Sequence, residues 1–379
     1  MKMKRVSLWL AVALVALAGG LFWAVSYRPV IEAGRTPVAG PYVLPQAVAG
    51  LKLHVFNTGM NRMSWFLVGD ARPWRPVPAF VIEHPNEGLI VFDAGLPAAV
   101  ETEGADAFSI PTRWVLESKG YAARTLDRQM EEAGLDPTKV KWVILSHMHE
   151  DHLGAVTGFP NASFMVGPGA SGDGLAPDFH PKWKSASFAG TKALPPFDGK
   201  IDLFGDGSVT LAPGGGHAHE GVMALLALPS GPALLAGDAV VHLDWLASDD
   251  VQRVSVDPER AADVRNEVRA LMKNDPQVVL FPGHDLDGVP EGRADIVLHH
   301  PEWFSMAGWD AQADHDGGLV SHGLNLSGVS EAWRGTFRRQ IGVGYLMLVC
   351  VPLPTARWSW REILSCFSAT MICQQSEGK

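Results

Sequence analysis

Cysteine is nearly absent from this chain. Only three cysteines occur, Cys350, Cys366 and Cys373, and all of them lie within the last thirty residues. A disulfide framework or a cysteine-ligated zinc ion therefore cannot serve the remainder of the chain.

Basic residues are also scarce. The chain has 31 Lys and Arg against 41 Asp and Glu, which gives a net charge of −10. Binding to phosphates needs clustered Lys and Arg, so this balance argues against a nucleic-acid partner. Apolar residues make up 47% of the 379 residues, and Gly and Pro are plentiful without any repeat, which favours a globular enzyme with many loops.

The N-terminus has the layout of an export signal. Lys2, Lys4 and Arg5 precede an N-terminal apolar run from Val6 to Val25. Ala16-Leu17-Ala18 offers a small-residue cleavage site, yet about 20 apolar residues can also cross a bilayer as an uncleaved anchor. Residues 1–27 are therefore expected to be a signal peptide or a membrane anchor. Both alternatives place the protein outside the cytoplasm, in the periplasm or attached to the membrane and facing the exterior.

Composition divides the rest of the chain into three parts. Residues 28–49 contain four prolines and read as a linker, and residues 50–298 are expected to form the catalytic domain. Residues 299–379 are rich in Trp, lack a clear period and are expected to be a C-terminal extension of unknown role.

Within the catalytic domain, apolar periodicity predicts alternating strands and helices. Strands are expected at 51–56, 64–68, 79–83, 88–92, 143–145, 222–228, 233–235 and 277–281, with turns at 57–59 and 85–88. Helices are expected at 125–133, from Gly154 onward, and from Pro258 to about Asn274 behind an Asp257 cap. A hairpin is expected around Gly205, and residues 167–200 are read as long loops.

Metal-ligating residue types are concentrated after one of these strands. The segment Ser146-His147-Met148-His149-Glu150-Asp151-His152 follows the apolar run at 143–145 and supplies three imidazoles and a carboxylate. Imidazole and carboxylate are the ligands that zinc and similar divalent metals prefer. The strand end is a rigid mount for such ligands, so the pattern predicts a metal site here.

This segment resembles the signature of the metallo-β-lactamase-fold hydrolases. Further elements of the same pattern occur in the same order: Asp93 in Val91-Phe-Asp-Ala-Gly, His217 in Pro213-Gly-Gly-Gly-His, Asp238 in Ala236-Gly-Asp-Ala, and His284 in Pro282-Gly-His-Asp. The resemblance covers residues 50–298 and implies an α/β fold, a four-layer αββα sandwich of two mixed sheets flanked by helices.

Seven candidate ligands result, which is too many for one tetrahedral zinc ion and suits two divalent metals, with zinc expected. The resemblance implies that His147, His149 and His217 hold the first metal. It implies that Asp151, His152 and His284 hold the second, while Asp238 bridges both. His219 competes with His217 for its role, and Asp93 is expected to orient a ligating His.

The closest resemblance is to the N-acyl homoserine lactone lactonases. It includes Trp74-Arg-Pro-Val-Pro-Ala-Phe, Phe159-Pro-Asn-Ala and Asp202-Leu-Phe-Gly-Asp-Gly-Ser-Val. It implies quorum quenching by opening a lactone ring through attack of a metal-bridging hydroxide, with Asp151 and Asp238 as catalytic residues and Asp151 passing the proton. Several such lactonases carry a Tyr where Val241 stands, and the neighbouring His242 is a possible substitute.

The sequence is also compatible with two other functions. One is a broad-specificity esterase or lactonase, or an organophosphate hydrolase, of the same fold. The other is a membrane-tethered module that binds metal without turnover. In each enzymatic case the partner is a small-molecule lactone or ester.

Overall fold

The computed structural model describes most of the chain up to Ser305. The described residues are 15–17, 19–20, 31–40, 46–64, 73–170, 179, 181–219, 221–249, 254–290 and 292–305.

The first sheet carries the segment richest in candidate ligands. Its strands run in the order β13-β1-β2-β3-β5-β6-β7, with β4 also paired to β1. The strands β1, β2 and β3 form antiparallel pairs, whereas β3, β5, β6 and β7 run parallel. The bounds are β1 Lys52–Met63, β2 Arg75–His84, β3 Gly88–Phe92, β4 Leu116–Gly120, β5 Val140–Ile144, β6 Ser163–Val166, β7 Lys182–Ser185 and β13 Ile296–Leu298.

The second sheet has the order β12-β11-β10-β9-β8. Its strands are antiparallel except for the parallel pair β11 and β12. The bounds are β8 Ile201–Asp202, β9 Val209–Pro213, β10 Val222–Leu226, β11 Ala233–Gly237 and β12 Val279–Pro282.

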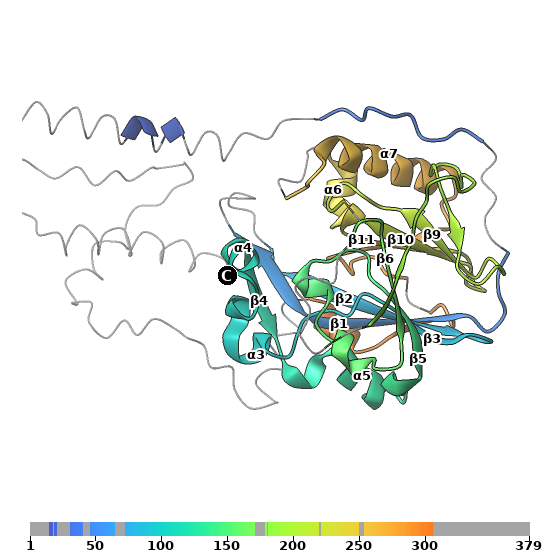
Figure 1. Ribbon diagram of the computed structural model, residues 1–379, viewed down its shortest axis with the longest axis horizontal. Helices are drawn as coiled ribbons and strands as arrows, with labels where there is room; N and C mark the ends of the chain where they lie inside the picture. Colours follow the sequence, from blue (N-terminus) through green and yellow to red (C-terminus); the bar gives the residue numbers. More distant parts are fainter. Residues whose placement is uncertain are drawn as a thin grey trace, which may run out of the picture. The chain divides into compact units, whose positions relative to one another are not determined.

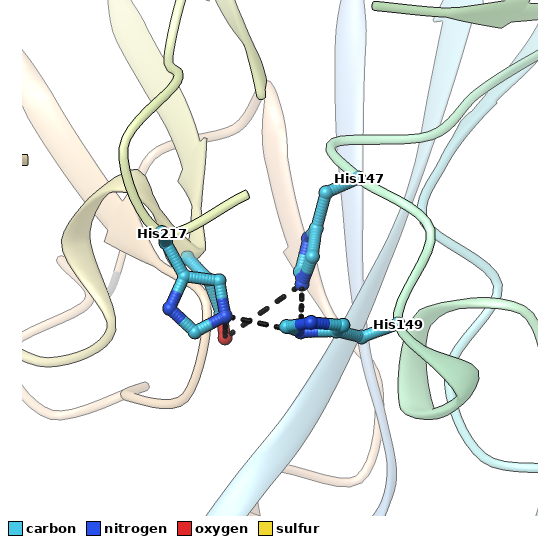
Figure 2. Close-up of side chains that lie close together, drawn as sticks. His147, His149 and His217 are labelled. Atoms are coloured by element: carbon cyan, nitrogen blue, oxygen red, sulfur yellow. Dashed lines mark hydrogen bonds and ion pairs between the residues drawn. The ribbon is translucent and has the colours of Figure 1, made fainter. Parts of the chain in front are cut away.

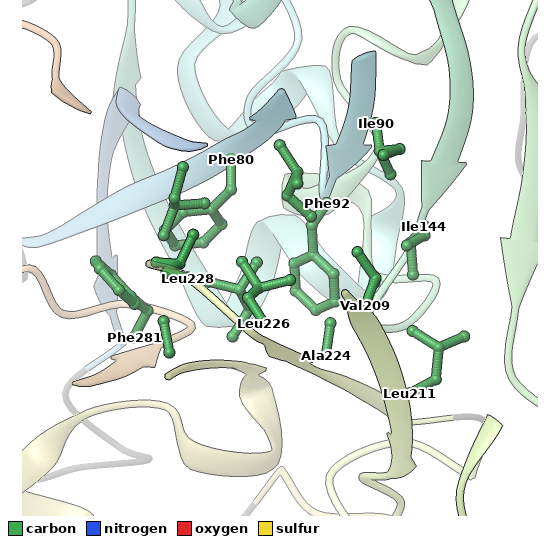
Figure 3. Packing of buried hydrophobic residues seen from close by; sticks show 14 of the residues in the cluster. Phe80, Ile90, Phe92, Ile144, Val209, Leu211, Ala224, Leu226, Leu228 and Phe281 are labelled. Atoms are coloured by element: carbon green, nitrogen blue, oxygen red, sulfur yellow. The ribbon is translucent and has the colours of Figure 1, made fainter. Parts of the chain in front are cut away.

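The two sheets pack face to face through an apolar core. Phe80 and Phe92 of the first sheet meet Leu226 and Phe281 of the second, and all four side chains are almost completely buried (Figure 3). Phe80 and Phe281 contact each other edge to face, with ring centroids 5.5 Å apart. Burial of this inner face is the main force that holds the sheets together.

Helices cover the outer face of each sheet. Helix α5 (Leu126–Glu132) covers the first sheet and helix α7 (Pro258–Asn274) covers the second (Figure 1). Leu126 and Met130 of α5 and Val264 and Val268 of α7 make the apolar contacts. The structure is thus a helix–sheet–sheet–helix sandwich, and the predicted four-layer fold is confirmed. The described part of the domain also contains three shorter helices, α3 Val100–Glu103, α4 Ile110–Val115 and α6 Leu243–Ala247.

Several predicted elements are confirmed in place. Helix α5 lies within the range expected at 125–133, and Asp257 caps α7 as expected by accepting a hydrogen bond from the Arg260 amide at 3.0 Å. The expected hairpin around Gly205 is formed by β8 and β9, and the turn after His84 connects β2 to β3.

Three predictions are wrong. Residues 57–59 form no turn, because β1 continues through them to Met63 with an irregularity in its register, and the Asn57 side chain accepts the Val77 amide at 2.9 Å. No α-helix starts at Gly154, where only short 3₁₀ turns occur. The segment 167–200 is not all loop, since β7 pairs with β6. The strand expected at 64–68 lies outside the described residues except for Ser64, which is not in a strand.

The segments flanking the sandwich are described only in part. Residues 31–40 and 46–49 form no helix or strand, and Arg35 donates its backbone N–H to Asp263 of α7 at 2.8 Å. The N-terminal apolar run lies largely outside the described residues, and none of the helices in the described part is long and apolar enough to cross a membrane. Described structure continues past 298, because Trp303 is buried against Met60 of β1. The remainder of the expected C-terminal extension lies outside the described residues.

Candidate active site

The ends of several strands meet at one edge of the sandwich, and the segments that follow these strands carry the candidate ligands. The loop after β5 holds His147, His149, Asp151 and His152. From the second sheet, the β9–β10 connection holds His217, while Asp238 directly follows β11 and His284 follows β12. The two sheets therefore contribute ligands to one place from opposite sides.

The first group consists of three imidazoles that converge (Figure 2). Nδ1 of His149 lies 2.7 Å from Nε2 of His147 and 3.0 Å from Nε2 of His217. His147 and His217 are buried, whereas His149 is exposed to solvent. Together with Asp238 these residues form a group whose ligand atoms all lie within 4.8 Å of one another.

The second group consists of Asp151, His152 and His284, which are all buried and whose ligand atoms also lie within 4.8 Å of one another. Asp238 connects the groups. Its Oδ2 lies 3.3 Å from His217 Nε2, whereas its Oδ1 lies 3.5 Å from both His152 Nε2 and His284 Nε2. One carboxylate thus presents one oxygen to each group.

Hydrogen bonds fix the tautomers of the second group. Nδ1 of His152 lies 2.9 Å from Asp93 Oδ2, and Nδ1 of His284 lies 3.0 Å from the Pro76 carbonyl oxygen. Both partners can only accept, so in the neutral, metal-binding form of each ring Nδ1 carries the proton and Nε2 turns its lone pair toward the group. Asp93 also accepts the Ser146 amide through Oδ1 at 2.7 Å. The geometry agrees with the predicted orienting role of Asp93.

Two atoms of the site have no hydrogen-bond partner among the described residues. These are His152 Nε2 and Asp238 Oδ1, and both are buried. Buried polar atoms are rarely left unsatisfied, and no described Lys or Arg is paired with Asp93, Asp151 or Asp238. Lone pairs that converge on a buried, anionic site without basic residues fit divalent cations.

The pKa shifts of the ligands also favour binding of cations at this site. Burial lowers the pKa of His147 well below its ordinary value, and neighbouring imidazoles add to the effect. Burial opposes protonation of His152 too, but Asp93, Asp151 and Asp238 raise its pKa to about 10. Burial raises the pKa of Asp238, yet the nearby imidazoles lower it by more. Asp238 is therefore ionised at neutral pH and requires positive partners.

Other polar residues near the candidate ligands in the sequence lie outside the two groups of ligands. His219, the alternative to His217, is exposed, and Glu150 turns away to accept hydrogen bonds from the Ser109 amide (2.9 Å) and hydroxyl (3.1 Å). His242 accepts the Trp245 amide through Nδ1 at 3.1 Å, so its Nε2 carries the proton.

Sequence reasoning missed Asn61. Its side-chain amide donates to Asp151 Oδ2 at 2.8 Å, and both residues are buried. No pattern in the chain indicated this contact, because the expected turn at 57–59 had placed Asn61 outside the sheet.

A sandwich of this architecture with a double His/Asp group at one edge is the framework of a metal-dependent hydrolase. A family model described as the metallo-beta-lactamase superfamily matches residues 72–284. The chain therefore belongs to the metallo-beta-lactamase superfamily and is a metal-dependent hydrolase.

Curated relatives in this superfamily include the N-acyl homoserine lactonase AttM. The protein from Azorhizobium caulinodans is 32% identical over 211 residues, which cover 51% of this chain and 74% of that protein. The one from Rhizobium radiobacter is 33% identical over 210 residues, with the same coverage. Among solved structures, an AiiA variant of Bacillus thuringiensis with N-decanoyl-L-homoserine at its active site superposes with a TM-score of 0.51. That match has 20% identity and covers 64% of this chain and 95% of the other, so it supports the fold alone.

Proposed function

We propose that this protein opens the lactone ring of N-acyl homoserine lactones and so acts in quorum quenching. The observation that carries the proposal is the position of Asp238, whose two oxygens face two separate groups of histidines. Curated relatives named N-acyl homoserine lactonase support the substrate class.

We assign the seven ligands to two metal ions, with zinc as the expected metal. His147, His149 and His217 would hold one ion, Asp151, His152 and His284 the other, and Asp238 both. Two bound dications would lower the pKa of bound water to about 7 and would stabilise negative charge that develops on a carbonyl or alkoxide oxygen.

Asp151 is placed to move the proton in this reaction. Asn61 occupies Asp151 Oδ2, whereas Oδ1 lies 4.0 Å from His152 Nε2 and accepts no hydrogen bond from the described residues. In ring opening, the oxygen of water forms a bond to the carbonyl carbon and the bond from that carbon to the ring oxygen breaks. Asp151 Oδ1 takes the proton from the water and delivers it to the ring oxygen, which leaves as the hydroxyl of the N-acyl homoserine.

Two exposed apolar side chains follow a residue that contacts the ligand loop, and they favour an acyl chain as part of the substrate. Helix α4 begins just after Ser109, which is hydrogen-bonded to Glu150 in the ligand loop. This helix exposes Ile110 by 53% and Trp114 by 67%. Exposed large apolar side chains close to a catalytic loop favour a substrate with an apolar tail.

His242 is proposed as a hydrogen-bond donor to the substrate in place of the Tyr that Val241 replaces. Burial, followed by the charge of Arg75, lowers the pKa of His242 to about 4, so the ring is neutral at pH 7. Its Nε2–H is then available to a carbonyl oxygen, and we expect His242→Ala to lower kcat roughly tenfold or more.

The decisive experiment measures proton release when zinc-loaded protein receives N-hexanoyl or N-decanoyl homoserine lactone, with aryl esters and a phosphotriester in parallel. We expect lactone opening that is lost in Asp238→Ala. If aryl esters or the phosphotriester are turned over and lactones are not, the broad esterase or organophosphate hydrolase is the better assignment. If two metals bind and no ester of any kind is cleaved, the protein is a metal-binding module.

We also propose that the protein is exported by its N-terminal apolar run, either as a cleaved precursor or as an anchored form. The three cations before that run support the proposal. Cell fractionation with N-terminal sequencing of the mature protein tests it. Full-length protein in the cytosol would contradict export.

A further inference from the structure

Asp151 is held by a residue of the central strand β1. Asn61 Nδ2 donates to Asp151 Oδ2 at 2.8 Å, and both residues are 5% exposed. The backbone of Asn61 is paired on both sides, with Arg75 of β2 and with Ser118 of β4. A side chain mounted on a strand with two neighbours is a rigid support for a carboxylate that lies in a loop.

A second hydrogen bond fixes which end of the amide faces Asp151. Ser118 Oγ donates to Asn61 Oδ1 at 2.6 Å. With its oxygen occupied by a hydroxyl donor, the amide must turn its NH₂ group toward the carboxylate. The chain Ser118–Asn61–Asp151 is thus ordered in one direction, from donor to acceptor.

A neutral donor suits this position better than a cation. Asp151 Oδ2 also lies 3.4 Å from His284 Nε2, which turns its lone pair toward the site. A Lys or Arg in place of Asn61 would put a fixed positive charge beside a group that is to hold divalent cations, and would weaken their binding by repulsion. An amide restrains the carboxylate without that charge.

From this geometry we propose that Asn61, locked by Ser118, is the positioning residue that orients Asp151 for metal binding and proton transfer. With Oδ2 restrained, Oδ1 is kept free for the proton. The inference rests on the role proposed above for Asp151, and it adds two residues that do not touch the substrate.

The main test compares Asn61→Asp with Asn61→Ala in the full-length protein. The Asp variant keeps the shape of Asn61 but sets a carboxylate against Asp151, whereas the Ala variant only removes the donor. We expect the dissociation constant of the weaker-bound zinc, measured by competition with a chromophoric chelator, to rise roughly 10- to 100-fold in Asn61→Asp and less in Asn61→Ala. We expect kcat for N-hexanoyl homoserine lactone to fall in the same order, with KM changed about twofold or less.

Ser118 gives an independent test of direction. In Ser118→Ala the Asn61 side-chain amide is free to flip, so we expect zinc affinity to fall. Ser118→Thr retains the hydroxyl group, so we expect it to retain zinc affinity. Asn57→Ala is the matched control, because Asn57 lies on the same strand, is fully buried and donates to the Trp303 carbonyl at 2.7 Å instead of to the site. It is expected to lower the melting temperature and to leave zinc affinity and the cobalt(II) absorption spectrum unchanged.

The outcomes separate this inference from the proposed function. Asn61→Asp that binds zinc as tightly as the wild type, or that is less impaired than Asn61→Ala, would overturn the inference, since a packing role predicts that order. Wild-type protein that binds two zinc ions but opens no lactone would reject the proposed function, and the comparison of zinc affinities would still decide the role of Asn61.

Discussion

Replacement of Asp93 by asparagine should weaken metal binding without a large change in shape. Asp93 follows β3 with a left-handed φ of 58°, a conformation that asparagine tolerates as well as aspartate does. Asp93→Asn therefore adds no backbone strain. Its effect should come from the two hydrogen bonds that the carboxylate accepts, from the Ser146 amide at 2.7 Å and from His152 Nδ1 at 2.9 Å.

The amide introduced by Asp93→Asn can accept only one of these bonds. If its oxygen keeps the Ser146 bond, its NH₂ group faces His152 Nδ1 and forces the imidazole proton onto Nε2, the atom that should bind metal. We expect zinc affinity to fall roughly 10- to 100-fold. Loss of one hydrogen bond to a charged group costs about 1.5–3 kcal/mol of unfolding free energy. For a domain of this size that corresponds to a melting temperature lower by about 3–12 °C.

The assays are zinc competition with a chelator and calorimetry of the metal-free protein. Asp206→Asn is the matched control, because Asp206 also accepts a histidine, His84 Nε2 at 3.1 Å, and a backbone amide, that of Ser208 at 2.9 Å. Asp206 and Ser208 precede β9, whereas His217 follows the other end of that strand. The control should lose stability and retain zinc affinity. Wild-type zinc affinity in Asp93→Asn would refute the tautomer argument.

Three further predictions concern separate parts of the sandwich. In Gly283→Ala the new Cβ would lie 2.0 Å from Asp238 Oδ1, so metal content and activity should fall together, whereas Gly34→Ala, with no atom within 4 Å of its new Cβ, should change neither. His84→Ala removes the bonds that join β2 to Ser208, so calorimetry should show a loss of about 2–4 kcal/mol while activity per folded molecule is retained. Burial, then His54, lowers the pKa of His299 from 6.5 to about 4. Because the folded pKa is depressed, neutral His299 contributes stability above pH 6.5 that is lost as the pH falls toward 4. The loss is about 1 kcal/mol after a discount for partial exposure, and His299→Gln should flatten that part of the stability curve.

The residues that the fold brings together could be predicted because strand ends leave clear signatures in a sequence. The apolar run before His147 and the Gly-Asp and Gly-His pairs at Asp238 and His284 each mark a buried strand followed by a ligand type. The position of Gly237 fits this view, since its φ of 49° and a virtual Cβ 2.4 Å from Ser146 Cβ permit no side chain there.

Tertiary context explains what the sequence did not predict. Asn57-Thr58-Gly59 has turn chemistry, yet in the fold Asn57 and Thr58 are buried and their side chains bond to the Val77 backbone, which carries β1 through the segment. Strand β4 has no apolar alternation and is positioned by its pairing with the far half of β1. The Asn61–Asp151 contact depends on both features, so no local pattern could have indicated it.

The origin of the ligands from two sheets has a mechanical consequence. His147, His149, Asp151 and His152 belong to one layer, and His217, Asp238 and His284 belong to the other. Cations bound by these residues would cross-link the two sheets at one edge of the sandwich. The melting temperature of the protein should therefore rise with the free zinc concentration. At a free zinc concentration a thousandfold above the dissociation constant, each bound ion adds about 4 kcal/mol to the free energy of unfolding. A chelator would therefore destabilise the packing of the two sheets as well as inactivate the enzyme.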